Sequence, residues 1–282
     1  MKDGLTAQAT GEAPHEDGAP SPSVPPPLAA ARLGGRNVRT LHLLRNLSFL
    51  LFLAFSLGVF IPLPQIILLR WRDPKTTAFI EARQAHLRAL GRSDAIDRRP
   101  VGLGQVAPAL VRAVLAAEDA RFFEHHGIDW EAVSSARQWN QAHARSRRRR
   151  LHGASTLTQQ LAKNLWLTGE RTWWRKGREG IDALALDLLV PKARILEIYL
   201  SAIELGETTY GCEAASRALF GVSASRLSAS QAARLAALIP RPVWYRAHPE
   251  AWERRAELIA QRMESQPVPA GLTNTRALES PK

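Results

Sequence analysis

AAEDARFFEHHGIDW, residues 116–130, places two adjacent acids, two phenylalanines and two histidines between apolar flanks. In and before this stretch, apolar residues recur at helical spacing: Val111, Val114, Leu115 and Phe122. The spacing predicts a helix that Gly127 ends. Neighbouring residues do not share a helix face, so Glu118 and Asp119 point in different directions from the predicted helix. Either both are solvated, or one of them is a catalytic carboxylate. Apolar surroundings raise the pKa of a carboxylate by desolvation, which suits a general base near neutral pH.

The rest of the chain also favours helices. Of its 282 residues, 45% are apolar, and alanine, leucine and arginine are abundant. Four further segments have the pattern of amphipathic or buried helices: 157–167, 178–189, 193–203 and 229–239. No alternating apolar run is long enough to predict a large sheet. We therefore expect a mostly α-helical domain at residues 76–262, followed by a flexible tail at 263–282.

The N-terminal quarter has a different composition. Residues 1–45 begin with a segment rich in Pro, Ala, Gly and Ser, which predicts a disordered tail. Residues 46–69 carry no charge and contain enough apolar residues to cross a hydrocarbon core roughly 30 Å thick, with Pro62 and Pro64 near the far end. A buried core helix or a cleaved signal peptide fits this length and context less well. We predict an uncleaved transmembrane signal anchor with the tail in the cytoplasm, although arginines on both flanks give this orientation little support.

The charge points to anionic partners. The formal net charge is +12, which attracts nucleic acid, anionic lipid headgroups or pyrophosphates. The run Arg145–Arg150 is typical of a solvated loop that contacts polyanions. No helix-turn-helix, zinc-finger or aromatic-interleaved basic pattern accompanies the run, so we expect no nucleic-acid partner.

Several chemistries lack their motifs. The sequence contains no P-loop, Rossmann glycine fingerprint, H-E-x-x-H, G-x-S-x-G, or S-x-x-K with K-T-G. The single cysteine, Cys212, excludes an internal disulfide and a cysteine-rich metal cluster. His125 and His126 precede a glycine and are more typical of a turn than of a metal site. We predict no metal ligands and no required cofactor.

Two later segments carry polar groups that suit an anionic ligand. Thr156 and Gln159 have the spacing of a capping box, and the helix after them places Gln160, Lys163 and Asn164 on one face. This face lies near a helix N-terminus, which favours anions, although a capped surface helix gives the same spacing.

The second segment, RKGREGIDALALDLL at 175–189, has Arg175 and Glu179 at i, i+4 before a largely apolar stretch. Most such pairs are exposed, but charged residues in the first turns of a helix whose remainder is buried are held rigidly. Two acids on separate helices, Glu118 and Glu179, with cations nearby, suit chemistry at a sugar carbon.

These stretches match one family in order. EDARFFEHHGID at 118–129 fits the motif E-D-x-x-F-x-x-H-x-G-x-D, and GASTLTQQLAKN at 153–164 fits G-x-S-T-x-T-Q-Q-x-x-K-N. RKGRE at 175–179 fits R-K-x-x-E, and residues 192–206 and 228–242 resemble the two motifs that follow. Across residues 100–245 the chain thus resembles the peptidoglycan glycosyltransferases, glycosyltransferase family 51, and specifically the monofunctional biosynthetic members.

The resemblance implies a fold and a set of roles. The fold would be a lysozyme-like helical domain with a small membrane-proximal lobe. The enzyme would polymerise lipid II by inverting glycosyl transfer and release undecaprenyl diphosphate. Glu118 would be the general base, and Glu179 a second acid that places the acceptor or a cation. The remaining site residues would bind substrate: Asp119 supports the base, Lys163, Arg175 and Lys176 hold the pyrophosphate, and Thr156, Gln160 and Asn164 line the donor side.

The resemblance also implies a setting. The partners would be lipid II, the undecaprenyl-diphosphate-linked glycan, membrane lipids, and proteins of cell-wall synthesis or division. The chain would be a single-pass protein of the bacterial cytoplasmic (inner) membrane, with its catalytic domain on the outer, periplasmic side. A divalent cation, Mg²⁺ or Mn²⁺, assists some relatives, though no ligand cluster here demands one.

Three positions depart from the family pattern. Ser201 stands where the fourth motif usually has Asn, Arg241 stands where a small amide residue is usual, and the run Arg145–Arg150 is denser than usual. Two alternatives remain open: a lysozyme-like enzyme that cleaves peptidoglycan, and a basic membrane-anchored protein that binds polyanions. The cations of the second and third motifs argue against a hydrolase, because a neutral glycosidic bond offers no pyrophosphate to hold.

Overall fold

The computed structural model describes residues 34–60, 62–144, 153–167, 172–269 and 272. Contacts divide the chain into two units, residues 1–52 and 53–282. In the first unit the described residues form the beginning of α1 (Gly34–Phe60). We predicted disorder for residues 1–45, but residues 34–45 are helical, because the leucine-rich sequence from Leu41 onward is a good helix former.

The uncharged segment 46–69 forms two helices. α1 ends at Phe60, and α2 (Leu63–Leu68) begins after Pro62, which stands at its N-cap, with Pro64 in its first turn. Proline lacks the N–H that continues a helix but is tolerated in a first turn, which explains both the break and the restart. Within the described ranges, no helix combines the length and the apolar character needed to cross a membrane.

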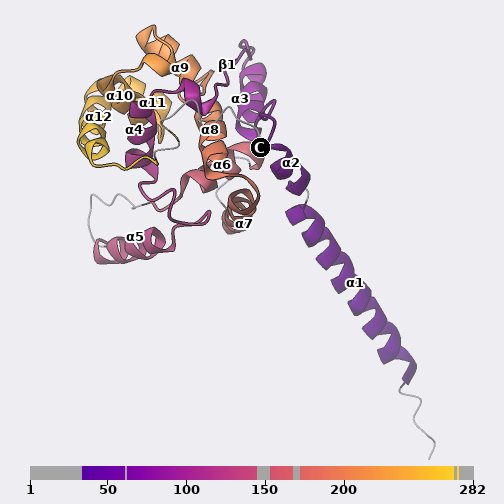
Figure 1. Cartoon of the computed structure of the whole chain (residues 1–282). Coiled ribbons are helices and arrows are strands. Elements are labelled where there is room, and N and C mark those ends of the chain that lie inside the picture. The colour runs from indigo at the N-terminus through magenta and orange to yellow at the C-terminus, as the bar shows by residue number, and fades with distance from the viewer. Residues whose placement is uncertain (1–33, 61, 145–152, 168–171, 270–271, 273–282) are drawn as a thin grey trace, which may run out of the picture. The chain divides into compact units, whose positions relative to one another are not determined.

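The second unit is mostly helical, as we predicted (Figure 1). Its further helices are α3 (Ala78–Ala89), η1 (Leu103–Gln105), α4 (Pro108–Glu118), α5 (Trp130–Ala142), α6 (Leu157–Trp166), α7 (Trp173–Leu189), α8 (Lys192–Ala202), α9 (Cys212–Phe220), η2 (Ala224–Arg226), α10 (Ala229–Leu238), α11 (Pro242–Ala247) and α12 (Pro249–Glu264). Two short strands, β1 (Asp97–Arg98) and β2 (Thr209–Tyr210), pair in parallel, with Asp97 opposite Thr209.

The core is built around two groups of helices. α4, α10 and α12 pack side by side (Figure 1), and the alanines of α10 let the three axes approach closely. α6 packs on α7 and α8. α8 belongs to the core, and its fully buried side chains are Ile195, Leu196, Ile198 and Tyr199. Together these groups fix the end of α4 and the whole of α6, the two elements that carry the first two sequence motifs.

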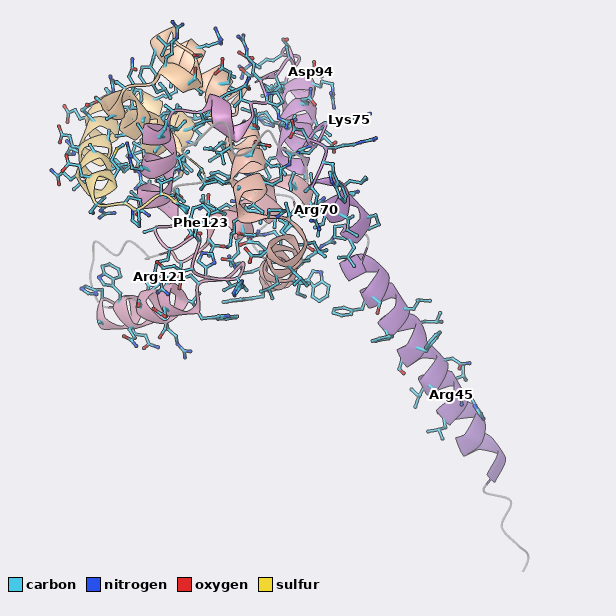
Figure 2. All side chains as sticks on the ribbon, viewed as in Figure 1. Arg45, Arg70, Lys75, Asp94, Arg121 and Phe123 are labelled. Atoms are coloured by element: carbon cyan, nitrogen blue, oxygen red, sulfur yellow. The ribbon has the colours of Figure 1, made fainter. Side chains whose placement is uncertain are left out.

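The helix that contains Glu118 is shorter than predicted. We expected it to continue to Gly127, but α4 ends at Glu118 because Asp119 leaves the helical region at φ −162° and ψ 76°. Arg121 and Phe123 lie on the loop that follows (Figure 2). Gly127 instead closes that loop: its φ is +75°, and a Cβ there would lie 2.7 Å from the carbonyl oxygen of Ala183 on α7.

The C-terminal helix reaches past the predicted domain limit. α12 continues two residues beyond residue 262, to Glu264, with Met263 buried. Gln266 Nε2 then donates a hydrogen bond of 2.9 Å to the carbonyl oxygen of Ala120. The described part of the predicted tail therefore includes residues that contact the loop after α4.

Candidate active site

Glu118 holds its carboxylate between two other helices. Gln160 Nε2 on α6 donates to Oε2 at 3.0 Å, and Arg255 Nη2 on α12 donates to Oε1 at 3.0 Å. The side chain of Glu118 is only 11% exposed. One carboxylate thus joins three helices that are far apart in the sequence.

The surroundings of Glu118 make its carboxylate more basic than an ordinary one. Burial raises the pKa of Glu118 above its ordinary value, and the negative charge of Asp119 adds to this effect. The hydrogen bond from Gln160 and the charge and hydrogen bond of Arg255 act in the opposite direction but do not outweigh the desolvation. A carboxylate with a raised pKa accepts a proton more readily than an ordinary one, as a general base must.

A buried tyrosine orients the amide that contacts Glu118. Tyr199 on α8 donates through its hydroxyl to Gln160 Oε1 at 2.9 Å, so the amide nitrogen of Gln160 faces Glu118. The pKa of Tyr199 lies well above its ordinary value because the ring is fully buried and because Glu118 and Asp119 lie nearby. The hydroxyl therefore keeps its proton and remains a donor.

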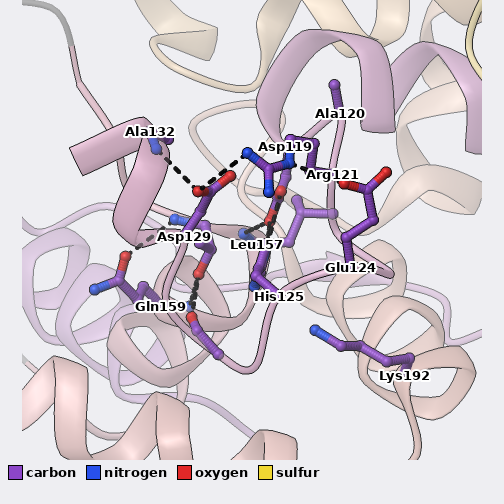
Figure 3. Close-up of polar contacts among 12 residues, drawn as sticks. Asp119, Ala120, Arg121, Glu124, His125, Asp129, Ala132, Leu157, Gln159 and Lys192 are labelled. Atoms are coloured by element: carbon purple, nitrogen blue, oxygen red, sulfur yellow. Dashed lines mark hydrogen bonds and ion pairs between the residues drawn. The ribbon is translucent and has the colours of Figure 1, made fainter. Parts of the chain in front are cut away.

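Asp119 connects the first motif to the second (Figure 3). Its Oδ2 accepts the backbone N–H of Leu157, the first residue of α6, at 2.9 Å. His125 Nε2 lies 3.0 Å from its other oxygen. A carboxylate at a helix N-terminus is stabilised by the helix dipole, so Asp119 is suited to fixing α6 against the end of α4.

The predicted capping box is confirmed. Thr156 accepts from the backbone N–H of Gln159, whose side chain bonds back to the N–H of Thr156. The hydroxyl of Thr156 also donates to the carbonyl oxygen of Gly127 at 2.6 Å. The start of α6 is thus tied to both ends of the loop 119–127.

Glu179 gathers the cations of α7. Its carboxylate accepts from Arg175 Nη1 at 2.9 Å and from Lys176 Nζ, and its side chain is 4% exposed. Lys176 Nζ also donates to the hydroxyl of Ser155 at 2.9 Å. The predicted Arg175–Glu179 pair is therefore present, and it is buried rather than solvated.

Lys163 completes this cation cluster from α6. Burial lowers the pKa of Lys163; the charge of Glu179 counteracts this effect, while Arg175 and Lys176 add to it. Its ammonium lies 5.3 Å from the centre of the Phe79 ring. Three cations with one carboxylate among them leave a positive surplus that suits a multiply charged anion.

An open hollow of about 290 Å³ lies beside Glu118. Glu118, Asp119, Ser155 and Thr156 are among its lining residues. Ser155 links this hollow to Lys176, and Gln160 lies one turn before Lys163 on α6. Asn164, the remaining predicted residue, is buried on the same helix.

No group of three or more His, Cys, Asp or Glu that could hold a metal ion occurs among the residues the structure describes.

Sequence reasoning missed four residues of this site: Ser155, Tyr199, Arg255 and, as the partner of Asp119, His125. Arg255 left a detectable signal. Trp252, Ala256, Ile259 and Met263 form the apolar stripe of α12, and Arg255 lies beside that stripe. An arginine beside a buried stripe either extends to solvent or pairs with an acid, and the structure shows that Arg255 pairs with Glu118.

Two of the residues that depart from the family pattern, Ser201 and Arg241, have contacts close to them in the structure. The Ser201 hydroxyl accepts from the backbone N–H of Val101 at 3.1 Å and donates to its carbonyl oxygen at 3.2 Å. Arg241 is exposed and lies 5.1 Å from the centre of the Trp244 ring. The run Arg145–Arg150 lies outside the described residues.

Comparison with known proteins gives a consistent result. A family model described as Transglycosylase matches residues 84–264. The biosynthetic peptidoglycan transglycosylase of Laribacter hongkongensis is 40% identical over 221 residues, covering 78% of this chain and 94% of that protein. Proteins of the same name from Thiobacillus denitrificans and Rhodospirillum centenum are both 45% identical, over 70% and 69% of this chain and 84% and 80% of their own lengths.

Proposed function

The chain belongs to the transglycosylase family and is a peptidoglycan glycosyltransferase that polymerises glycan strands, and from this premise we propose a role for each residue of the site. The single observation that carries the proposal is Glu118, a buried carboxylate with a raised pKa that lines a hollow. Its partner Gln160 lies one turn before Lys163, a member of the cation cluster, on α6.

Glu118 acts as the general base. It takes the proton of the acceptor sugar's 4-hydroxyl, and the oxygen attacks the anomeric carbon of the donor with inversion. The bond from that carbon to the diphosphate oxygen breaks, and undecaprenyl diphosphate leaves with the electron pair. Gln160 and Asp119 support this step, Gln160 by holding the base and Asp119 by fixing the start of α6.

Lys163, Arg175 and Lys176 hold the diphosphate as its charge grows. Glu179 positions Arg175 and Lys176, because its carboxylate accepts from both. Thr156 and Asn164 support the donor side through the placement of α6. The hydrolase alternative is not favoured, because these cations have no task on a neutral glycosidic bond.

The proposal includes a lysozyme-like domain with a small lobe close to the membrane and one anchor at residues 46–69. The uncharged sequence of that segment supports an anchor, and a lipid-linked substrate requires access to a bilayer. The exposed Trp173, Trp174 and Leu188 of α7 support a lobe at the membrane surface. The catalytic domain would work on the periplasmic side of the cytoplasmic membrane.

Incubation of the detergent-solubilised full chain with labelled lipid II tests the proposed function. We expect polymer that lysozyme can digest, together with released undecaprenyl diphosphate. Cleavage of preformed glycan without polymer formation would instead support the hydrolase alternative.

Replacement of Arg255 with methionine should change the pH dependence of polymerisation. The positive charge of Arg255 lowers the pKa of Glu118, so its loss raises that pKa further and moves the acid limb of kcat/KM to higher pH. We expect roughly a tenfold loss near neutral pH with partial recovery at alkaline pH. Arg254→Met, which changes an exposed neighbour on α12, is the control. A uniform loss at every pH would contradict this role for Arg255.

A further inference from the structure

A cavity of about 640 Å³ lies between α2, the connection after it, the start of α3 and the end of α6. Its apolar lining includes Leu68, Leu69, Ala78, Leu165 and Trp166, and its charged lining includes Arg72, Asp73, Lys75 and Glu81. Arg72, Lys75 and Glu81 are exposed, and Lys75 extends away from the α2–α3 connection (Figure 2). Asp73 pairs with Arg194 at 2.8 Å. The cavity thus has an apolar wall and a solvated rim, and the reaction described above makes no use of it.

The cavity lies in line with the active site along α6. Gln160, Lys163 and Trp166 follow one another at steps of three residues, so neighbours in this series are adjacent on the helix surface, and the series winds by about a third of a turn between its ends. At a rise of 1.5 Å per residue, Trp166 is about 9 Å from Gln160 along the axis. Gln160 contacts the base, Lys163 belongs to the cation cluster, and Trp166 lines the cavity.

α3, like α6, has residues at both the cavity and the cation cluster. The ammonium of Lys163 lies over the ring of Phe79, and the preceding residue, Ala78, lines the cavity. A diphosphate held by Lys163 would therefore lie next to the cavity. A group esterified to that diphosphate, on the side away from the sugar, would then have the apolar wall within reach.

We propose that this cavity binds the isoprene units of the polyprenyl carrier that are nearest to the diphosphate. The inference rests on the proposed function, which places the diphosphate at Lys163. A polyprenyl-diphosphate sugar has its reacting carbon, its diphosphate and its chain in one line, the order in which α6 presents base, cations and cavity. Leu68 and Leu69 belong to the uncharged segment 46–69, so a chain that leaves the cavity meets the proposed membrane anchor.

The apolar wall is rigid enough to select a chain. Trp166 Nε1 donates to Gln65 Oε1 at 2.6 Å, which holds the indole against α2. Leu69 and Leu165 are 5% and 7% exposed, so their positions are fixed by the core. Isoprene units bound there lose water-exposed apolar surface, which is the main source of affinity for a hydrocarbon chain.

Two substitutions test the cavity without altering the cation cluster. Ala78→Leu fills part of the space, and Leu68→Asn removes an apolar side chain from a wall position that is 51% exposed, so little folding energy depends on it. Leu90→Asn is the matched control: Leu90 is 56% exposed at the other end of α3, at its C-cap, where asparagine is tolerated.

Calorimetry on the detergent-solubilised full chain then compares geranyl diphosphate, which carries two isoprene units, with inorganic pyrophosphate, which carries none. We expect the wild type to bind geranyl diphosphate more tightly, and Ala78→Leu and Leu68→Asn to weaken that binding by about tenfold while pyrophosphate binding and the Leu90→Asn control stay unchanged. Equal binding of both probes by the wild type would overturn the inference. Equal weakening of both probes, or of neither, in the two cavity variants would also overturn it.

This test is separate from that of the proposed function. If the wild type selects geranyl diphosphate through the cavity but forms no polymer from lipid II, the assigned reaction is wrong and the prenyl site stands. If it forms polymer but the cavity variants bind both probes as the wild type does, the reaction stands and the prenyl site is wrong.

Discussion

Replacement of Glu118 with glutamine is expected to lower kcat for lipid II polymerisation by about 10³-fold, the usual scale for loss of a general base. Glutamine keeps the size of the side chain but cannot accept the proton of the attacking hydroxyl. Its single amide oxygen can keep the bond from Arg255, and Gln160 can turn its own amide over to accept from the new amide nitrogen, so the three helices joined at this position should stay in place. The measurement is the initial rate of polymer formation from labelled lipid II, with circular dichroism to check the fold.

The control for this variant is Glu124→Gln. Glu124 lies six residues after Glu118, on the loop that follows α4, and its exposed side chain pairs with Arg121 at 2.9 Å (Figure 3). Glu124 itself is not among the residues that line the hollow. Loss of such an exposed pair costs little stability, so activity should stay near that of the wild type. Activity of Glu118→Gln within a few-fold of the wild type would refute its assignment as the base.

The helices of this fold could be predicted because their signals are local. The capping box at Thr156 and the i, i+4 pair of Arg175 and Glu179 depend only on spacing along one helix, and both are present. The end of α4 could not be predicted in the same way. Asp119 stops the helix because its carboxylate bonds to the N–H of Leu157 and to His125, and the first of these partners lies 38 residues away.

The links between the motifs could not be read from the sequence for the same reason. Burial decides whether a charged pair is a solvated surface pair or a rigidly held site, and Glu179 is buried in a helix, α7, that packs on α6, α2 and α8. Arg255 illustrates the limit: its place beside the apolar stripe of α12 separates it from Arg254, but the sequence does not show that its partner is Glu118, 137 residues away. The family resemblance named the motif residues but did not name Arg255, which lies after the last of the five motifs.

Replacement of Lys163 with methionine is expected to lower kcat/KM for lipid II by about 10²- to 10³-fold, the range found when one preorganised donor to a developing anion is removed. Methionine keeps the length and the apolar stem of lysine, so the packing of α6 should persist, and its sulfur can take the place of the ammonium against the ring of Phe79. The missing charge leaves Arg175 and Lys176 to hold the diphosphate, and both are already bonded to Glu179.

The loss at Lys163 should appear in binding as well as in rate. Inorganic pyrophosphate should bind more weakly to Lys163→Met, whereas Lys163→Arg, which keeps the charge, should recover part of both binding and turnover. If Lys163→Met bound pyrophosphate as the wild type does, the diphosphate would lie elsewhere. If arginine rescued nothing, the position would require the compact shape of an ammonium, because Lys163 sits partly buried between Phe79 and the charged groups of α7.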